Sequence, residues 1–275
     1  MSTEVSVYGS TGFVGSRYCE MYRDSIHIPR EENFPRSGNI LYFISTTHNY
    51  YIFDEPHRDI DTNLNKLISV LEECRKSGND IVFNFISSWF VYGMNCSMDT
   101  KETDACDPRG FYSITKRAAE QMLICYCNTF GMKYRILRLC NMIGPSDKTV
   151  SAKRNALQYM IGLLKKNEPI KLYDNGTNVR DFMHVDDACR AIRVCVETAP
   201  HNEIINISNC DGTPIGDAIK YAKDRLGSTS ELIPIDPPHF HSVVQVKNVR
   251  LNNQKLLSYG YIPSINTWQA IETLL

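Results

Sequence analysis

The sequence predicts an α/β protein with a doubly wound parallel sheet and a smaller α/β cap at its C-terminal side. Short apolar runs alternate with helical stretches through the first half of the chain. No hairpin turn separates neighbouring apolar runs, and a glycine-rich turn follows the first run directly. Parallel strands need crossover connections, so alternation without hairpins indicates a parallel sheet that is covered by helices.

The elements of the first half follow from their apolar spacing. The run at 40–45 is apolar throughout its middle, as in a strand covered on both faces. The stretch 63–76 has apolar residues at helical spacing, and Gly131 ends a longer helix. Strands are expected at 5–8, 25–29, 40–45, 81–86 and 134–139, and helices up to residue 22 and at 63–76 and 112–130.

The second half of the chain is less regular. It is expected to contain helices at 156–166, 186–198 and 216–226, and short strands at 170–173 and 204–207. No repeat or low-complexity linker separates the halves. We therefore expect the cap to be closely attached to the sheet.

Composition excludes several classes of partner. The 275 residues carry a net charge of −1, without the basic excess of a nucleic-acid-binding protein. No apolar run approaches the roughly 18 residues of a membrane span, and no signal pattern precedes the first strand, so a cytoplasmic protein is expected. The ten cysteines form no C-x-x-C motif, which predicts reduced, buried thiols and no metal site. His239 and His241 are interpreted as loop residues, because two histidines alone do not make a metal site.

The glycine turn is the first motif with a chemical meaning. Its pattern is Gly9-x-x-Gly12-x-x-Gly15, placed between a strand and a helix. Glycine permits the tight turn, the approach of a pyrophosphate and close helix packing, and the helix N-terminus faces the phosphates. The pattern also occurs in ordinary strand–helix turns, but its place after the first strand favours a Rossmann-type dinucleotide site. The expected dinucleotide-binding residues of this turn are Gly9, Thr11, Gly12, Phe13, Val14 and Gly15.

Two further motifs carry acid–base chemistry. Tyr112 and Lys116 are four residues apart on a helix and therefore share one face. An ammonium group beside a phenol lowers the phenol's pKa from about 10, which makes it a usable acid or base. Ser87 and Ser88 follow a predicted strand at the sheet edge where α/β proteins bind ligands.

Together these motifs resemble the extended short-chain dehydrogenase/reductase family, in particular its nucleotide-sugar epimerases, dehydratases and reductases. Ser-Ser-x-x-Val-Tyr-Gly at 87–93 precedes Pro108-x-x-x-Tyr112-x-x-x-Lys116, in the family's order. The resemblance extends over nearly the whole chain, through segments at 138–145, 176–187, 205–208 and 251–263.

The resemblance implies a role for each matching residue. Tyr112 would be the acid/base, Lys116 would lower its pKa and hold the nicotinamide ribose, and Ser88 rather than Ser87 would complete the catalytic set. Asn141 and Arg180 would contact a nucleotide-diphosphate sugar, with Arg180 on the diphosphate, whose oxygens match a guanidinium. Asp181 and residues 184–187 are expected to be structural, and an ion pair between Arg180 and Asp181 is the alternative to ligand binding.

The resemblance also implies a domain division. Residues 1–145 would form the dinucleotide-binding Rossmann domain, and residues 146–275 would be mainly a substrate-binding cap. Within the second part, some segments near 180–208 are candidates to pack with the Rossmann domain rather than with the cap. A homodimer is expected through the Tyr112 helix and its neighbour.

Two departures from the family pattern bear on the reaction. Dehydratases carry an Asp-Glu pair directly after the Ser, where this chain has Trp89 and Phe90. These aromatic residues cannot transfer protons, so a 4,6-dehydratase is not expected; they would shape the sugar pocket or pack beneath it. The usual strand and acidic segment between Arg30 and Ile40 are also missing, so the sheet is expected to lack a strand there.

The cofactor expectation depends on the end of the second strand. NAD-selective members place an acid there, whereas this chain has Pro29 and then Arg30, which suits the 2′-phosphate of NADP. Glu31 and Glu32 follow closely, and a slip of one or two residues would restore NAD. NADP favours a reductase acting on a 4-keto-sugar nucleotide, with an NAD-dependent epimerase as the alternative. A non-catalytic dinucleotide-sensing or scaffold protein is the hypothesis from another class.

Overall fold

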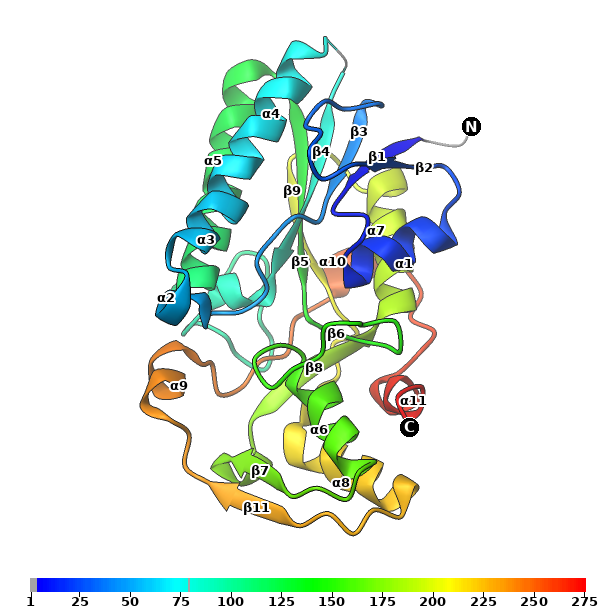
Figure 1. Cartoon of the computed structure of the whole chain (residues 1–275). Helices are drawn as coiled ribbons and strands as arrows, with labels where there is room; N and C mark the ends of the chain where they lie inside the picture. The colour runs from blue at the N-terminus through cyan, green and yellow to red at the C-terminus, as the bar shows by residue number, and fades with distance from the viewer. Residues whose placement is uncertain (1–3, 79) are drawn as a thin grey trace.

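A six-stranded parallel sheet forms the centre of the larger domain (Figure 1). The computed structural model describes residues 4–78 and 80–275. The sheet order is β2-β1-β3-β4-β5-β9, and every neighbouring pair is parallel. Its strands are β1 (Val5–Tyr8), β2 (Ser25–Ile28), β3 (Asn39–Tyr42), β4 (Val82–Ser88), β5 (Lys133–Leu139) and β9 (Glu203–Ile207). The predicted α/β fold class is therefore confirmed.

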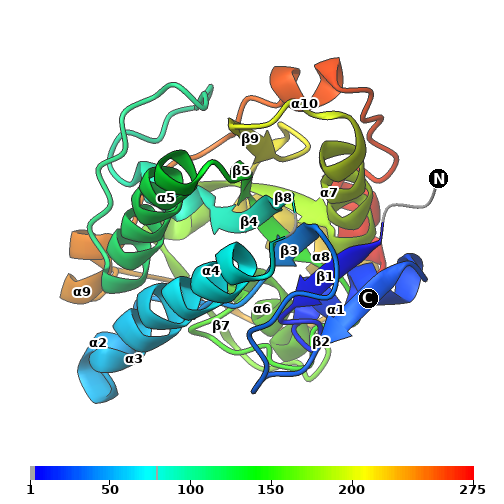
Figure 2. The ribbon, with the colours of Figure 1, turned by 90° about the horizontal axis from the view of Figure 1, so that it is seen from above.

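Helices cover both faces of this sheet (Figure 2). On one face lie α1 (Phe13–Met21) and α7 (Val185–Thr198), and on the other lie α4 (Lys66–Lys76) and α5 (Phe111–Phe130). Alternate strand residues supply the two cores, since Leu41 packs on the first face and Ile40 and Tyr42 on the second. This two-sided burial explains the wholly apolar strands seen in the sequence.

The sheet ends at β2, one strand short of the usual Rossmann order, in which another strand lies beyond the second. Residues 29–38 cross from β2 to β3 as an irregular segment. Tyr8 Oη donates to the Asn33 carbonyl at 2.7 Å, and Lys66 Nζ donates to the Arg30 carbonyl at 3.0 Å. The sequence predicted that the sheet lacks a strand in this region, and the described residues 29–38 contain none. Side-chain hydrogen bonds hold this irregular segment in place.

The cap lies beyond the carboxyl ends of the strands (Figure 1). Two small sheets and several helices build the cap. In the described part of the whole chain, no helix is long and apolar enough to cross a bilayer. The cap strands are β6 (Asn141–Ile143), β7 (Ile170–Tyr173), β8 (Val179–His184), β10 (Gly212–Pro214) and β11 (Leu232–Ile235). The cap helices are α6 (Ala156–Leu164), α8 (Ile215–Leu226), α9 (His239–Val244) and α11 (Thr267–Glu272).

Short helical turns complete the larger domain. They are α2 (Tyr51–Asp54), α3 (His57–Ile60), the π-helical turn η1 (Asp61–Asn65) and the 3₁₀ turn η2 (Trp89–Tyr92). A further 3₁₀ turn, η3 (Asp174–Gly176), follows β7 in the cap.

The chain crosses between the domains more than once. The segment of α7 and β9 returns to the larger domain, where β9 pairs with β5. The C-terminal segment containing α10 (Gln254–Ser258) also packs there, because Leu251, Leu256 and Tyr261 belong to the core cluster of β1 and β5. Apolar contacts thus hold part of the C-terminal segment, within residues 246–261, against the larger domain.

A buried ion cluster joins β4, β5 and α5 beneath the carboxyl edge of the sheet. Arg138, only 1% exposed, donates to both Glu120 oxygens, with Nε–Oε1 at 3.0 Å and Nη2–Oε2 at 2.8 Å. Ser87 Oγ donates to Glu120 Oε1 at 2.6 Å, and Arg117 Nη1 donates to Oε2 at 2.8 Å. Burial alone raises the pKa of Glu120, but the ion pair with Arg138 lowers it below its ordinary value.

Removing the carboxylate from this cluster should strongly destabilise the fold. Glu120→Ala leaves Arg138 as a buried, unpaired charge, which costs about 3–5 kcal/mol of unfolding free energy. Urea unfolding followed by circular dichroism measures the loss. Glu73→Ala removes an exposed pair with Lys76 and is the control, expected within about 0.5 kcal/mol of the wild type. Equal effects of the two substitutions would contradict the role given to the cluster.

Candidate active site

The glycine turn lies at the carboxyl end of β1, between the ends of β2 and β3. Gly9 has a φ of +77°, and a Cβ on Gly15 would lie 2.3 Å from the Gly9 carbonyl oxygen. Both positions therefore require glycine for the turn itself. A Cβ on Gly12 would meet only the Gly9 carbonyl oxygen, at 3.4 Å. The surface at Gly12 is consequently open to a ligand.

The start of α1 has the geometry of a phosphate site. Gly12 is the N-cap and supplies no side chain, so the N–H groups of the first turn are not capped by one. Thr11 is exposed, and Phe13 and Val14 are half-buried beside it. The N-terminus of a helix with uncapped N–H groups attracts phosphate oxygens.

Tyr112 and Lys116 occupy the first turns of α5, where they are 8% and 2% exposed. Lys116 Nζ donates to the Ile86 carbonyl at 2.7 Å and lies 4.1 Å from the centre of the Phe85 ring. Burial lowers the pKa of Lys116 to about 7. Burial also raises the pKa of the Tyr112 phenol, and hydrogen bonds with Ser88 and Ser45 act in the opposite direction.

These contacts correct one expectation from the sequence. Lys116 was expected to lower the pKa of Tyr112, but its ammonium group hydrogen-bonds to the end of β4 instead. Desolvation dominates for both groups, and it raises the pKa of the phenol while it lowers that of the amine.

The two serines that end β4 point to opposite sides of the strand. Ser87 is buried and donates to Glu120, whereas Ser88 is half-buried, accepts from Phe90 N at 3.3 Å and interacts with Tyr112. The structure therefore brings Ser88, and not Ser87, to Tyr112.

A polar network beside Tyr112 was missed in the sequence. Ser45 Oγ donates to Asn63 Oδ1 at 3.1 Å, Asn63 Nδ2 donates to Thr46 Oγ1 at 2.8 Å, and Thr46 donates to Asp59. Burial raises the pKa of Asp59. The available signal was the polar run Ser45-Thr46-Thr47 at the end of a central strand, where ligands bind in α/β sheets.

A cavity of about 640 Å³ lies between the larger domain and the cap, and four of the five expected substrate residues line it. They are Trp89, Phe90, Asn141 and Arg180. The stacked rings of Trp89 and Phe90 lie 4.0 Å apart, and the Phe90 ring lies 6.0 Å from that of Tyr112. The two aromatic residues therefore form part of the wall, and the cavity extends to the neighbourhood of the fifth residue, Ser88.

Arg180 is a buried cation with no carboxylate partner among the described residues. Its Nη1 donates to the carbonyls of Val179 and Lys247, and its Nη2 to that of Val246, each at 2.8 Å. Burial lowers the pKa of Arg180 to about 10. An anionic ligand in the cavity would supply the missing counter-charge.

The alternative of an Arg180–Asp181 ion pair is wrong. Arg180 and Asp181 are successive residues of β8, so their side chains point to opposite faces of the strand. Asp181 accepts hydrogen bonds from Ser208 Oγ and, at 3.0 Å, from Leu251 N. Asn141 Nδ2 donates to the Asp181 carbonyl at 3.1 Å, which places its side chain between β6 and β8.

Arg30 lies at the same sheet edge as the glycine turn. It follows Ile28, the last residue of β2, which pairs with Tyr8 directly before Gly9. The exposed Arg30 lines a second cavity of about 650 Å³ with His57 and Arg58 and with three acids, Asp54, Glu55 and Asp61. Glu32, one of the two acids considered for NAD, forms an ion pair with Arg36 at 2.7 Å.

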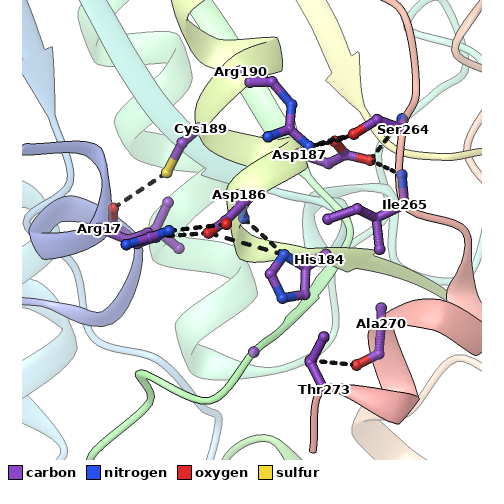
Figure 3. Close-up of polar contacts among 12 residues, drawn as sticks. Arg17, His184, Asp186, Asp187, Cys189, Arg190, Ser264, Ile265, Ala270 and Thr273 are labelled. Atoms are coloured by element: carbon purple, nitrogen blue, oxygen red, sulfur yellow. Dashed lines mark hydrogen bonds and ion pairs between the residues drawn. The ribbon is translucent and has the colours of Figure 1, made fainter. Parts of the chain in front are cut away.

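Residues 184–187 connect the start of α7 to α1 and to the C-terminal segment (Figure 3). His184 Nδ1 accepts from Asp186 N at 3.2 Å, and Arg17 Nε lies 2.6 Å from Asp186 Oδ1. Asp187 accepts from Ser264 Oγ and Ile265 N, both at 2.8 Å. These contacts hold the glycine-turn helix α1 against α7 and α7 against the C-terminal segment.

Comparisons with known proteins agree with this geometry. The profile described as "NAD dependent epimerase/dehydratase family" matches residues 40–208. A putative UDP-glucose 4-epimerase of Methanocaldococcus jannaschii is 26% identical over 222 residues, covering 81% of this chain and 70% of that protein. UDP-glucose 4-epimerase of Thermotoga maritima with UDP-glucose matches with a TM-score of 0.87 and 22% identity, covering 98% and 96% of the two chains. RMD of Pseudomonas aeruginosa complexed with NADPH matches with a TM-score of 0.84 and 21% identity, covering 98% of this chain and 97% of that one.

Burial of Lys116 predicts a pH-dependent stability cost. Its pKa of about 7 lies below its ordinary 10.5, so the unfolded chain binds more protons between these values and wild-type stability rises with pH there. Lys116→Met should therefore be more stable than the wild type at pH 6, on the order of a few kcal/mol, and the gap should narrow by pH 9. Urea unfolding at both pH values tests this.

The exposed Lys166 provides the control, and Lys166→Met should differ from the wild type equally at both pH values. A constant gap for Lys116→Met would show that Lys116 is not desolvated as described.

Proposed function

The chain belongs to the NAD dependent epimerase/dehydratase family, and we propose that it transfers hydride between a nicotinamide dinucleotide and a carbon of a nucleotide-diphosphate sugar. One observation carries the proposal: the same interdomain cavity is walled by the unneutralised Arg180 and by Phe90, whose ring contacts that of Tyr112. An anionic, ring-containing substrate fits a wall of this composition.

The glycine turn would hold the dinucleotide. The open surface at Gly12 and the uncapped N–H groups of α1 fit a pyrophosphate. The nicotinamide ring supplies or accepts the hydride when it is bound. Lys116, the buried cation on α5, would hold the nicotinamide ribose.

Tyr112 would exchange the proton of the reacting sugar oxygen, and Ser88 would hydrogen-bond to the same oxygen. An anionic dinucleotide would favour the charged form of the nearby Lys116. The amine, with its pKa of about 7, is thereby responsive to ligand charge near neutral pH. Asn141 and Arg180 would orient the substrate from the cap side.

Reduction of a 4-keto-sugar nucleotide is the reaction we favour. A reductase exchanges its dinucleotide in every turnover, and here the sheet ends at β2, with no outer strand among the described residues to cover that side of the site. Pro29 stands where an acid would select NAD, and Arg30 follows it directly, which favours NADP(H). Trp89 and Phe90 provide no group that could eliminate water, so dehydration is not proposed.

An epimerase is the second candidate, because the relative from Methanocaldococcus jannaschii is described as a putative UDP-glucose 4-epimerase. An epimerase keeps NAD bound and returns the hydride to the other face of the sugar. It would use Ser88, Tyr112 and Lys116 equally, so the cofactor preference separates the two reactions. A dinucleotide-sensing or scaffold protein would not need the acid/base.

We also propose a homodimer through α5 and α4, as the family resemblance implies. Exposed apolar side chains support this surface, namely Ile68 on α4 and Ile114 and Phe130 on α5.

Replacing the acid/base should remove turnover but leave binding intact. Tyr112→Phe is expected to lower turnover of a keto-sugar nucleotide by about 10²-fold or more, the usual scale for loss of a general acid. Dinucleotide affinity should change little. Steady-state kinetics and calorimetry measure the two effects, with Tyr126→Phe on the same helix as the control. Wild-type turnover in Tyr112→Phe would refute the assignment.

Arg30 should determine the choice of dinucleotide. A charged contact to the 2′-phosphate is worth roughly 1.5–3 kcal/mol, so wild-type protein should bind NADPH about ten- to a hundredfold more tightly than NADH. Arg30→Ala should erase most of this difference and leave NADH affinity nearly unchanged, whereas Arg36→Ala should change neither. Titrations must share one salt concentration, because phosphate contacts are screened. A wild-type preference for NADH would favour the epimerase.

A further inference from the structure

His241 lines the interdomain cavity and carries a buried ring nitrogen that has no hydrogen-bond partner among the described residues. It lies on α9, is 8% exposed and lines the cavity together with Val244 and Gln245. Its Nε2 is hydrogen-bonded to Tyr50 Oη, whereas its Nδ1 is buried and has no hydrogen-bond partner among the described residues. A buried polar atom without a partner costs free energy, so this position favours a ligand that supplies one.

Both domains hold the His241 ring in place. Tyr50 precedes α2 in the larger domain, and Tyr173 ends β7 in the cap, 4.8 Å from the His241 ring centre. The neighbouring Phe240 packs against Tyr50 and Phe53, with its ring centre 5.3 Å from that of Tyr50 and 4.8 Å from that of Phe53. Helix α9 thus lies beside α2, joining the cap to the larger domain next to the cavity (Figure 1).

The protonation of the pair allows Nδ1 to be a hydrogen-bond donor. Burial lowers the pKa of His241, so its imidazole is neutral near pH 7, with one donor and one acceptor nitrogen. Burial raises the pKa of Tyr50, so its phenol keeps its proton. When Tyr50 donates to Nε2, the proton of the ring resides on Nδ1, and the unpaired atom needs an acceptor.

The charges of the cavity identify the kind of acceptor. Cationic side chains outnumber acidic ones in the cavity wall. Among the described lining residues, the one acid is Glu168. The cations are Lys153, Arg154, Lys171 and Arg180. The segment after α9 also binds Arg180 directly, through the carbonyls of Val246 and Lys247. One short segment therefore positions both the Nδ1 donor and the buried guanidinium.

We propose that His241 donates its Nδ1–H to a phosphate oxygen of the bound nucleotide-diphosphate sugar, and that Tyr50 selects the tautomer that makes this possible. The inference rests on the proposed function and adds to it a binding residue on α9 that sequence reasoning had interpreted as part of a loop. A diphosphate offers only acceptors and is anionic, which matches both the donor and the cationic wall.

Calorimetry with fragments of the substrate tests the proposal. Wild-type protein is titrated with UDP, dTDP, GDP, CDP and ADP, and the tightest binder is compared with its own nucleoside. His241→Phe preserves the ring packing and removes the donor. The double variant His241→Phe/Tyr50→Phe removes both partners, so that no hydroxyl is left unpaired if the single variant folds poorly. His239→Phe, an exposed position on the same helix, is the matched control.

The expected result is a loss of affinity for the diphosphate of roughly ten- to a hundredfold in both His241 variants. Affinity for the nucleoside and for NADPH should stay within about twofold of the wild type, and His239→Phe should change none of the three. Tyr50→Phe alone should give a smaller loss, because the tautomer is no longer selected.

Three outcomes overturn the inference. Unchanged diphosphate affinity in both His241 variants means that Nδ1 contacts no phosphate. Equal losses for the diphosphate and the nucleoside place the contact on the base or ribose, or indicate a distorted cavity. Failure of the wild type to bind any nucleoside diphosphate overturns the proposed function itself, and so is distinguishable from the first two.

Discussion

The carboxylate of Glu120 sets the relation between the sheet and the helix that carries Tyr112. It binds Ser87 at the end of β4, Arg138 on β5 and Arg117 on its own helix α5. Because successive residues of a strand face opposite sides, fixing Ser87 towards Glu120 turns Ser88 towards Tyr112. A slip of one residue would exchange the two serines, so the geometry of the candidate site depends on this buried charge.

The sequence predicted the parts of the site that depend on local pattern. Strand–helix alternation predicted the fold, and the Gly9–Gly15 turn predicted a helix start open at Gly12. It did not predict the link from Ser45 through Asn63 to Asp59, or the placing of His241 against Tyr50. Those contacts join residues far apart in the chain, and the short helices that carry them have no extended apolar period.

Lys116 shows why charge alone was an insufficient guide. Spacing correctly placed Lys116 one turn after Tyr112, but the inference treated the ammonium as fully charged and directed at the phenol. Only the folded structure reveals the Ile86 carbonyl as its partner and the depth of its burial. Desolvation works against the charged forms of both residues, and its size depends on packing that no local motif encodes.

Lys116 and Arg180 each carry an electrostatic cost of burial, one in each half of the site. Each is a buried cation whose pKa is lowered by burial, one behind the predicted dinucleotide and one in the wall of the substrate cavity. The chain compensates Arg180 with carbonyl dipoles rather than a carboxylate, and Lys116 likewise donates to a carbonyl. Dipoles leave net positive charge in place, whereas a carboxylate would cancel it. Two anionic ligands would therefore relieve two separate electrostatic costs, which favours a site that is most stable when both ligands are bound together.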